Sequence, residues 1–250
     1  MKKLLLFFAL IVTPAIAQQV VLLTVTSTVN GSPAIVGGQK WHVETASRPW
    51  SITQINPTTL RFELRSGDVR PGEYSSSVER DEINSGQEIR FGPGAPYTVQ
   101  FDLNVLPGVP NTAEWLVLYQ LAYPFQGMGV WNGSPDVEFG LVGEHLTLVA
   151  QIGCGEAAQQ INWPDGLWTD PQPIQRGTIH TFRFTMLFDA HSTDATVQAW
   201  RDGIQIVNFS GAIGCASTRE HFQSFGIYRA HAPQTMATQF GKLSFGTGPN

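Results

Sequence analysis

The chain has few cysteines, no excess of basic residues and no sustained helical periodicity. Each of these shortages excludes some classes of protein. Its 250 residues include 15 Lys and Arg against 20 Asp and Glu, which gives a formal net charge of −5. An acidic chain is a poor partner for nucleic acid, whose binding needs a basic surface. The sequence also lacks a linker, a low-complexity tract and a repeat of fixed period. It therefore predicts one domain that does not bind nucleic acid.

Long apolar runs are also missing, with one exception at the N-terminus. There two lysines precede the apolar run Leu4–Val12, and Ala15-Ile16-Ala17 follows before Gln18, which is the layout of a cleaved secretory signal. The sequence predicts a signal peptide over residues 1–17 and a secreted or periplasmic domain over 18–250. Cleavage removes two Lys and no acidic residue, so the net charge falls from −5 to −7. No other stretch approaches the ~20 apolar residues of a membrane span, so no membrane partner is expected.

The two cysteines are Cys154 and Cys215, each at the end of an Ile-Gly-Cys triplet. An exported chain meets an oxidising compartment, which favours a disulfide between them. A metal site and a reactive thiol are the alternatives, but no Cys/His cluster has metal-ligand spacing. We predict the disulfide, no metal and no other cofactor, with the oligomeric state left open.

Short segments with apolar alternation and β-branched or aromatic residues, separated by Gly and Pro, predict a nearly all-β chain. Asp202-Gly203 between two such segments is a strong hairpin signal, because a tight turn needs positive φ. We expect a two-sheet antiparallel β-sandwich of the jelly-roll type, with one concave outer face open to a long ligand. The predicted strands are Val20–Val29, Leu60–Arg65, Tyr97–Leu106, Trp115–Ala122, Val137–Leu141, Leu146–Ile152, His180–Phe188, Val197–Trp200, Ile204–Phe209, Phe225–Arg229 and Phe240–Phe245.

One of these β-compatible stretches, Ser76–Ile83, carries the main functional signal. The two-residue period of a strand puts Arg80, Glu82 and then Asn84 on one face. An Arg held by a neighbouring carboxylate is a preorganised fork for a substrate carboxylate. The alternative interpretation is a surface ion pair between the two charged residues with no role in binding.

The order of the segments resembles that of the jelly-roll polysaccharide lyases, the group that includes heparin lyase I, glucuronan lyase and the alginate lyases. The likeness covers about residues 41–245 and rests on short motifs in a fixed order. These motifs are Leu60–Arg65, Glu79–Ile83, Tyr97–Leu106, Trp115–Gln120, Gly177–Phe182, Trp200–Gly203 and Phe225–Arg229. The resemblance implies a concanavalin A-like jelly roll that cleaves an acidic polysaccharide by elimination. Calcium occurs in some relatives, so a structural calcium ion stays open.

The resemblance also assigns roles to particular residues. Its Arg-x-Glu strand falls on Arg80, with a rival match at Arg61–Arg65, and its Gln-x-His strand falls on Gln120. The Gly-x-Tyr strand falls on Gly226-Ile227-Tyr228. This implies that Arg80 and Gln120 bind the uronate carboxylate and that Tyr228 transfers protons. The chain departs from the pattern at Ala122, where the family has the His that acts as a base, and at Ser224, where alginate lyases tend to have Lys.

Elimination builds negative charge on the carboxylate, which the two donors would stabilise in the transition state. We expect the pKa of Tyr228 to lie below its usual value, because an Arg is near. The predicted catalytic residues are therefore Arg80, Gln120 and Tyr228. The predicted substrate-binding residues are Glu82, Asn84, Arg229 and His231.

The expected partner is an acidic polysaccharide such as glucuronan, alginate or a glycosaminoglycan. Because the surface is acidic, a polyanion needs a locally basic groove, for which the candidates are Arg65, Arg70, Arg80, Arg90, Arg183 and Arg229. A non-catalytic glycan-binding sandwich is the alternative function, favoured by Ala122 and by the net charge. A glycoside hydrolase would need two carboxylates across the scissile bond, and Glu79, Asp81 and Glu82 stand too close together in the chain for that pattern.

Overall fold

The computed structural model describes residues 19–86, 92–122, 135–153, 159–161, 166–189, 191, 193–214 and 220–247. The predicted signal peptide and both cysteines lie outside these residues. The residues that immediately precede the cysteines, Gly153 and Gly214, lie side by side, because the Gly153 N–H donates to the Gly214 carbonyl at 2.9 Å. The disulfide stays a prediction, and titration of the unfolded, unreduced protein is expected to find no free thiol.

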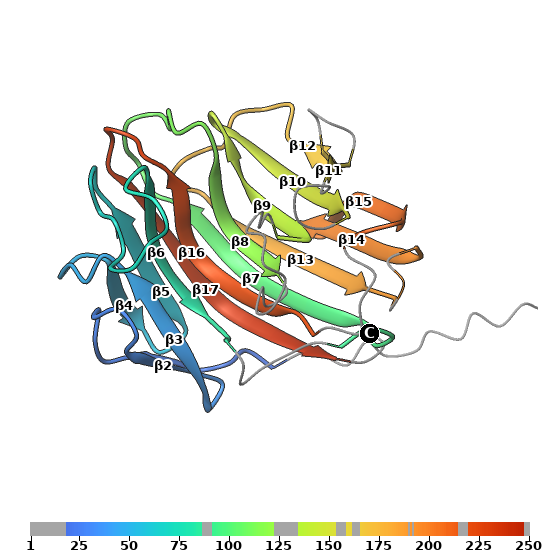
Figure 1. Cartoon of the computed structure of the whole chain (residues 1–250), viewed down its shortest axis with the longest axis horizontal. Coiled ribbons are helices and arrows are strands. Elements are labelled where there is room, and N and C mark those ends of the chain that lie inside the picture. Colours follow the sequence, from blue (N-terminus) through green and yellow to red (C-terminus); the bar gives the residue numbers. More distant parts are fainter. Residues whose placement is uncertain are drawn as a thin grey trace, which may run out of the picture.

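The described chain forms two antiparallel sheets and contains no helix (Figure 1). The first sheet has ten strands in the order β1-β2-β3-β6-β16-β8-β9-β10-β11, and β12 also pairs with β10. Its strands are β1 (Leu23–Val25), β2 (Pro33–Val36), β3 (Gln39–Thr45), β6 (Val78–Asn84), β8 (Leu116–Ala122), β9 (Val137–Val142), β10 (His145–Ile152), β11 (Gln159–Gln160), β12 (Trp168–Thr169) and β16 (Phe222–Ala230). Neighbours far apart in sequence, such as β6 and β16, thus lie side by side.

The second sheet has seven strands in the order β15-β14-β13-β7-β17-β5-β4. They are β4 (Ile52–Asn56), β5 (Thr59–Leu64), β7 (Tyr97–Val105), β13 (Ile179–Leu187), β14 (Ala195–Arg201), β15 (Ile204–Gly211) and β17 (Met236–Thr247). Asp202 and Gly203 join β14 to β15 with φ of 51° and 81°, so the predicted hairpin is confirmed. The β-sandwich prediction is also confirmed.

Aromatic side chains fill the space between the sheets. Phe101 on β7 is fully buried, and its ring centroid lies 5.5 Å from that of Phe225 and 5.7 Å from that of Tyr119, both on the first sheet. Large rings at these separations pack well and bury much apolar area. Because this core takes alternate residues of each strand, the other residues of the first sheet face outward.

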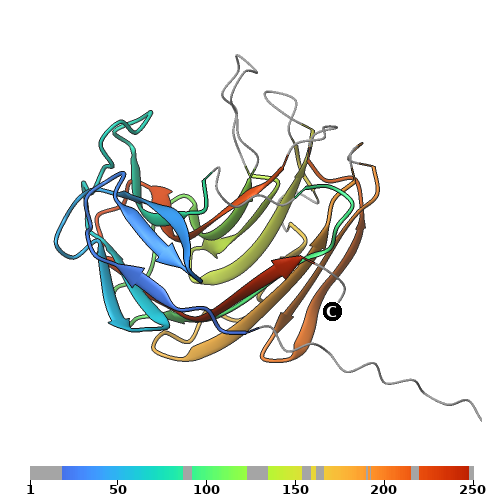
Figure 2. The same cartoon turned by 90° about the horizontal axis from the view of Figure 1, so that it is seen from below.

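Both sheets curve in the same direction, and the first lies on the inner side of the curve (Figure 2). The surface of the first sheet that points away from the second sheet lines the hollow of this curve, and we call it the concave face. It carries the side chains that alternate with the core residues, which are His42, Glu44, Arg80, Glu82, Asn84, Gln120, Glu138, Ser224 and Tyr228. Five neighbouring strands therefore supply one polar surface.

The predicted strand Val20–Val29 is wrong in extent, since only Leu23–Val25 forms a strand there. Val20 and Val29 are 46% and 56% exposed, and the Ser32 N–H donates to the Val29 carbonyl in a turn. Strands β2, β3 and β4 were not predicted. Apolar alternation alone did not separate these strands, which lie toward the ends of the two sheets, from their turns.

Candidate functional site

Strand β6 places the first predicted site residues. Its inner face carries Ile83 in the core, and its outer face carries Arg80, Glu82 and Asn84, as the two-residue period predicts. All seven residues of β6 are buried, because β3 and β16 flank the strand on both sides. The charged groups of β6 are thus held in place rather than free in solvent.

Arg80 is almost completely engaged by carboxylates. Its Nη1 donates to Glu44 at 3.1 Å and to Glu82 at 3.2 Å, and its Nε donates to Glu73 at 3.1 Å. Glu73 also bonds Arg70, which pairs with Glu44 in turn. Among the described residues, Nη2 of Arg80 has no hydrogen-bond partner. That nitrogen is the part of the guanidinium fork that these carboxylates do not occupy.

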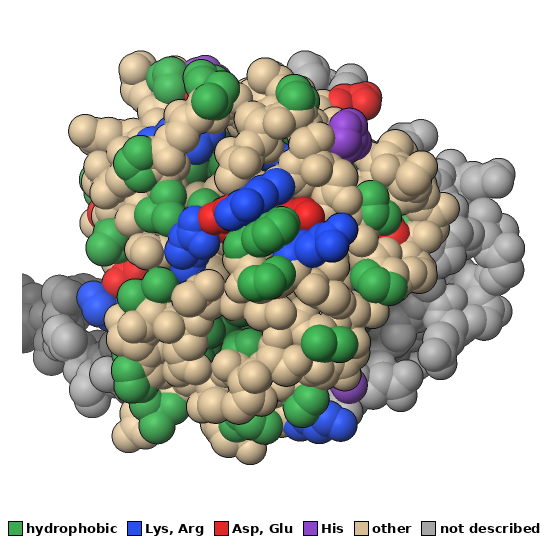
Figure 3. Space-filling view, turned by 90° about the vertical axis from the view of Figure 1, so that its left-hand side faces the viewer, with side chains coloured by type: hydrophobic (Ala, Val, Ile, Leu, Met, Phe, Trp, Pro, Cys, Tyr) green, Lys and Arg blue, Asp and Glu red, His purple; other side chains and the backbone are tan. Residues whose placement is uncertain are grey.

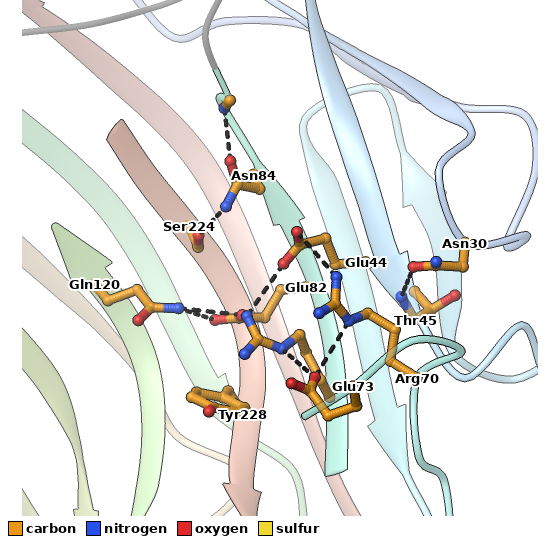
Figure 4. A network of polar contacts seen from close by, with 12 residues as sticks. Asn30, Glu44, Thr45, Arg70, Glu73, Glu82, Asn84, Gln120, Ser224 and Tyr228 are labelled. Carbon is orange, nitrogen blue, oxygen red and sulfur yellow. Dashed lines mark hydrogen bonds and ion pairs between the residues drawn. The ribbon is translucent and has the colours of Figure 1, made fainter. Parts of the chain in front are cut away.

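Gln120 on β8 joins this network through Glu82. Its Nε2 donates to the two carboxylate oxygens of Glu82 at 3.1 Å and 3.2 Å, as Figure 4 shows. Strand β16 runs between β6 and β8, and its residue opposite Glu82 is Gly226. Since glycine has no side chain, the Glu82 carboxylate reaches across β16 to the amide.

Gly226 is also required by the backbone. Its φ is 147°, and a Cβ there would lie 2.2 Å from the Asp81 carbonyl oxygen. The pairing of β16 with β8 shifts between Phe225 and Tyr228, so the glycine sits in a bulge. The bulge sets where Tyr228 stands relative to β8.

Tyr228 lies directly opposite Arg80, whose guanidinium carbon is 3.8 Å from the centre of the phenol ring. The Tyr228 hydroxyl donates to the Tyr74 hydroxyl at 3.2 Å, and the Trp115 ring packs edge-on at 4.8 Å between centroids. Arg80 therefore stacks on the ring, a cation–π contact, instead of bonding the hydroxyl. Arg80 thus stacks on Tyr228 and shares Glu82 with Gln120, so these side chains, far apart in sequence, form one cluster. Figure 4 shows Gln120, Glu82 and Tyr228 of this cluster.

Asn84 closes the cluster at the other end of β6. Its Nδ2 donates to Ser224 Oγ at 3.0 Å, and its Oδ1 accepts from the Gly86 N–H at 2.6 Å. Ser224 in turn lies opposite Gln120 in the β16–β8 register. The Ser at the family's Lys position therefore supports Asn84 and adds no charge.

Burial changes the protonation of several groups. Burial favours the neutral form of Arg80, but Glu82, Glu44 and Glu73 outweigh it and raise the pKa of its guanidinium. Burial raises the pKa of Glu82 to about 7, although Arg80 and Gln120 oppose the change. Burial also raises the pKa of Tyr228 above its usual value, because the nearby Arg80 only partly offsets it. The predicted lowering for Tyr228 is wrong, and its phenol is the resting form at neutral pH.

Two predicted substrate-binding residues lie away from this cluster. Arg229 follows Tyr228 and so points to the inner side, where it is fully buried and bonds Glu79 through Nε at 2.7 Å. It also donates to the backbone carbonyls of Ala232 and Gln234. His231 lies beyond the end of β16 and its Nδ1 is 2.8 Å from Glu79. The placement of Arg229 is a correction, because alternate residues of a strand face opposite sides. The binding role of His231, whose side chain is 48% exposed, stays a prediction.

The rival motif Arg61–Arg65 lies on β5 in the second sheet. Glu63 pairs there with both Arg61 and Arg65, and Arg65 stacks on Trp50 at 3.8 Å. Figure 3 views the side of the molecule toward which β4 and β5 lie, where acidic and basic side chains gather in one mixed group. This motif is a surface ion-pair cluster on the sheet that does not carry the concave face.

Two carboxylates bonded to Arg80, Glu44 and Glu73, were missed, and Arg70 was named only as a source of local charge. Glu44 comes from β3, and Arg70 and Glu73 come from the β5–β6 connection. The alternation of Trp41 and Val43 with His42 and Glu44 was an available signal for β3. Of the candidates for local basic charge, Arg70 and Arg80 lie here, whereas Arg90 lies outside the described residues and Arg183 stacks on Trp200 of the second sheet.

Metal binding finds no support in the described part of the chain, where no group of three or more His, Cys, Asp or Glu side chains is arranged to hold an ion. The same part contains no helix able to cross a membrane. The cluster described above consists of side chains of β3, β6, β8 and β16 and of the β5–β6 connection.

The fold is similar to that of several solved lyases. A glucuronan lyase from the fungus Trichoderma reesei matches with a TM-score of 0.60 at 11% identity, over 82% of this chain and 86% of its own. An alginate lyase from Corynebacterium sp. matches at 0.56 and 13% identity, over 91% and 92%. The chain has the fold of the jelly-roll polysaccharide lyases.

An alginate lyase of polysaccharide lyase family 7, AlgAT5, matches this jelly roll at a TM-score of 0.55 and 12% identity, over 92% of this chain and 94% of its own. No family profile and no curated relative matches the sequence. The likeness to the lyases therefore lies in the fold, and at these identities the site must be judged on its own residues.

Proposed function

We propose that this protein is a secreted or periplasmic polysaccharide lyase that cleaves a 4-linked uronic-acid polysaccharide by β-elimination. The observation that carries the proposal is one cluster on the concave face, in which Arg80 stacks on Tyr228 and shares Glu82 with Gln120. The lyase fold supports it, since the solved glucuronan and alginate lyases share the architecture. Glucuronan, alginate and glycosaminoglycans are the candidate substrates.

In the proposed reaction the sugar carboxylate binds to Nη2 of Arg80 and to the amide of Gln120. The phenolate of Tyr228 removes the proton from the carbon beside the carboxylate, and the electrons of that C–H bond form a double bond. The neighbouring C–O bond breaks, and Tyr228 returns the proton to the leaving oxygen. The raised pKa of Tyr228 makes the phenolate a minority form, so kcat is expected to rise with pH above neutrality.

A non-catalytic glycan-binding module is the second candidate. Two observations favour it: Ala122 stands where the family has a His base, and Arg80 is already bonded to three carboxylates. Such a module would hold the polysaccharide on the same face and release it unchanged.

Incubation with a panel of polyuronates tests the proposal. A lyase produces an unsaturated sugar that absorbs in the ultraviolet, and Gln120→Ala is expected to lower the rate at least tenfold while the protein stays folded. Retarded migration in polysaccharide gels without new absorbance would support the binding module instead. New reducing ends without absorbance would indicate hydrolysis and contradict elimination.

A further inference from the structure

Strand β9 brings another carboxyl group to the concave face, next to Gln120. Glu138 lies between the core residues Val137 and Phe139, so its side chain points outward, and its register partner on β8 is Gln120. Directly opposite side chains have Cβ atoms about 4.5–5.5 Å apart. Among the described residues, the Glu138 carboxyl makes no hydrogen bond or ion pair. It is a part-buried acid beside the proposed binding amide.

Glu138 ends a polar row that crosses five strands. Each member lies opposite the next in the sheet register, in the order His42, Asn84, Ser224, Gln120 and Glu138. The following strand, β10, contributes Val149, so the polar row stops there. A sugar carboxylate held at Gln120 would therefore also meet Glu138.

The charges around this row oppose a bound anion. Two guanidiniums, Arg70 and Arg80, face three carboxylates, Glu44, Glu73 and Glu82, and Glu138 adds a fourth. With all four acids ionised, an acidic sugar would enter a site of its own sign, which weakens binding. Binding becomes favourable when an acid takes up a proton.

The environment of Glu138 favours this protonation. Burial and then the nearby Glu82 raise the pKa of Glu138 to about 7. A sugar carboxylate beside it is a further like charge and raises the pKa again. A protonated acid in such a site is a hydrogen-bond donor, as in other enzymes that keep a carboxylic acid neutral. It would not then be available as a base.

Other titratable groups are less suited to this contact. Glu82 is fully buried and already bonded by Gln120 and Arg80, so a ligand does not reach it. Asp136, which precedes β9, is bonded to His221 at 2.7 Å. Val149 offers no charge from β10. Of the described groups around Gln120, Glu138 is the acid with a free donor position.

We propose that Glu138 is a substrate-binding residue whose protonated carboxyl donates a hydrogen bond to the sugar carboxylate held by Gln120, so that an acidic oligosaccharide binds together with one proton. This inference rests on the proposed function, because it assumes a uronic-acid ligand. It adds a residue that discriminates acidic from neutral sugars.

The test is calorimetric titration of Tyr228→Phe protein, which cannot turn over, with uronic-acid tetrasaccharides from glucuronan and from alginate. From pH 7 upward the Kd is expected to rise about tenfold per pH unit. Titrations in two buffers of different ionisation enthalpy should give uptake of about one proton. The additional change Glu138→Gln is expected to remove both effects, because an amide donates at every pH. Cellotetraose, a neutral tetrasaccharide, is the ligand control.

Matched variants separate the outcomes. Glu138→Ala should bind the tetrasaccharide at least tenfold more weakly than Glu138→Gln, since alanine cannot donate, and Glu82→Gln should keep the pH dependence. An unchanged pH slope in Glu138→Gln would overturn the inference alone. So would full binding by Glu138→Gln with loss of turnover when Tyr228 is present, because that result would make Glu138 a base. Failure of both tetrasaccharides, and of a glycosaminoglycan tetrasaccharide titrated in the same way, to bind at every pH would overturn the proposed function and this inference with it.

Discussion

The outer and inner faces of the β6–β16 pair both carry an Arg–Glu pair, yet the two pairs differ in their surroundings. On the outer face, Arg80 keeps one nitrogen without a described partner, and Tyr228 beside it is part-exposed. On the inner face, Arg229 and Glu79 have no solvent exposure. The outer pair lies in the proposed binding site, whereas the inner pair joins β16 to β6.

The inner face also holds an acid without a full set of partners. Asp81 accepts the Ala46 N–H through Oδ1 at 3.0 Å, whereas its Oδ2 has no hydrogen-bond partner among the described residues. Burial raises its pKa to about 8. A charged residue on β6 is therefore not always a site residue, because the face of the sheet on which it lies decides its contacts.

Tyr228→Phe is expected to show the largest difference between the two faces, because it should affect activity and not stability. Removing the phenol hydroxyl removes the proposed proton carrier, so kcat should fall about 10²–10⁴-fold. The free energy of unfolding should change by less than about 1 kcal/mol, because only the hydrogen bond to Tyr74 is lost. Steady-state kinetics and urea unfolding measure the two quantities. A loss of stability with unchanged kcat would reverse the assignment.

The adjacent change, Arg229→Met, should do the opposite. It removes the buried guanidinium from Glu79, which keeps only His231 and the Gly67 N–H, and the loss costs about 3–5 kcal/mol of stability. For a chain of this size the midpoint of thermal unfolding should fall by roughly 6–20 °C. The variant that still folds at low temperature should keep its lyase rate per folded molecule. A specific loss of affinity for substrate at full stability would restore the prediction that Arg229 binds sugar.

Asp81→Asn addresses the pH dependence of stability. The pKa of Asp81 is about 8 in the folded protein and about 4 when unfolded, so the folded state binds the proton more tightly. Its contribution to stability is full below pH ~4 and is lost as pH rises toward 8. The variant should therefore be more stable than the parent at pH 8.5, by on the order of 1–3 kcal/mol, with little gain at pH 5. Equal effects at the two pH values would contradict the raised pKa.

The smallest effect is expected from Arg61→Ala on β5. Its ion pair with Glu63 is part-buried, but Glu63 keeps Arg65 as a second partner, so the loss should cost only about 1 kcal/mol. Activity should not change, because β5 belongs to the other sheet. Lyase assays of Arg61→Ala beside Gln120→Ala compare the rival Arg-x-Glu motif with the concave face. A large loss of lyase activity in Arg61→Ala would place the active site on the second sheet and contradict its assignment to the concave face.

Much of this arrangement was predictable from local pattern. The period of two placed Arg80, Glu82 and Asn84 on one face, and Asp202-Gly203 predicted its hairpin. The same period separates Tyr228 from Arg229, so assigning both to the substrate was an avoidable error. The period does not extend to His231, because β16 ends before it.

Other features depend on pairing between distant strands, which a linear pattern does not contain. Glu44 reaches Arg80 only because β3 pairs with β6, and Glu138 meets Gln120 only because β8 and β9 take one particular register. The bulge at Gly226 shifts Tyr228 relative to β8. Register is set by packing of the whole core, so the crowding of carboxylates around Arg80 could not be read in advance.

If the cluster of Arg80, Gln120 and Tyr228 breaks the polysaccharide by elimination, each cut leaves one unsaturated end and one reducing end. The ratio of these two kinds of end is the most direct test of the reaction. Ultraviolet absorbance counts unsaturated ends and a reducing-sugar assay counts all new ends in the same digest of the preferred polyuronate. Elimination predicts one unsaturated end for each new reducing end, with both signals lost together in Tyr228→Phe. New reducing ends without unsaturated ones, or an undiminished ratio and rate in Tyr228→Phe, would contradict the account.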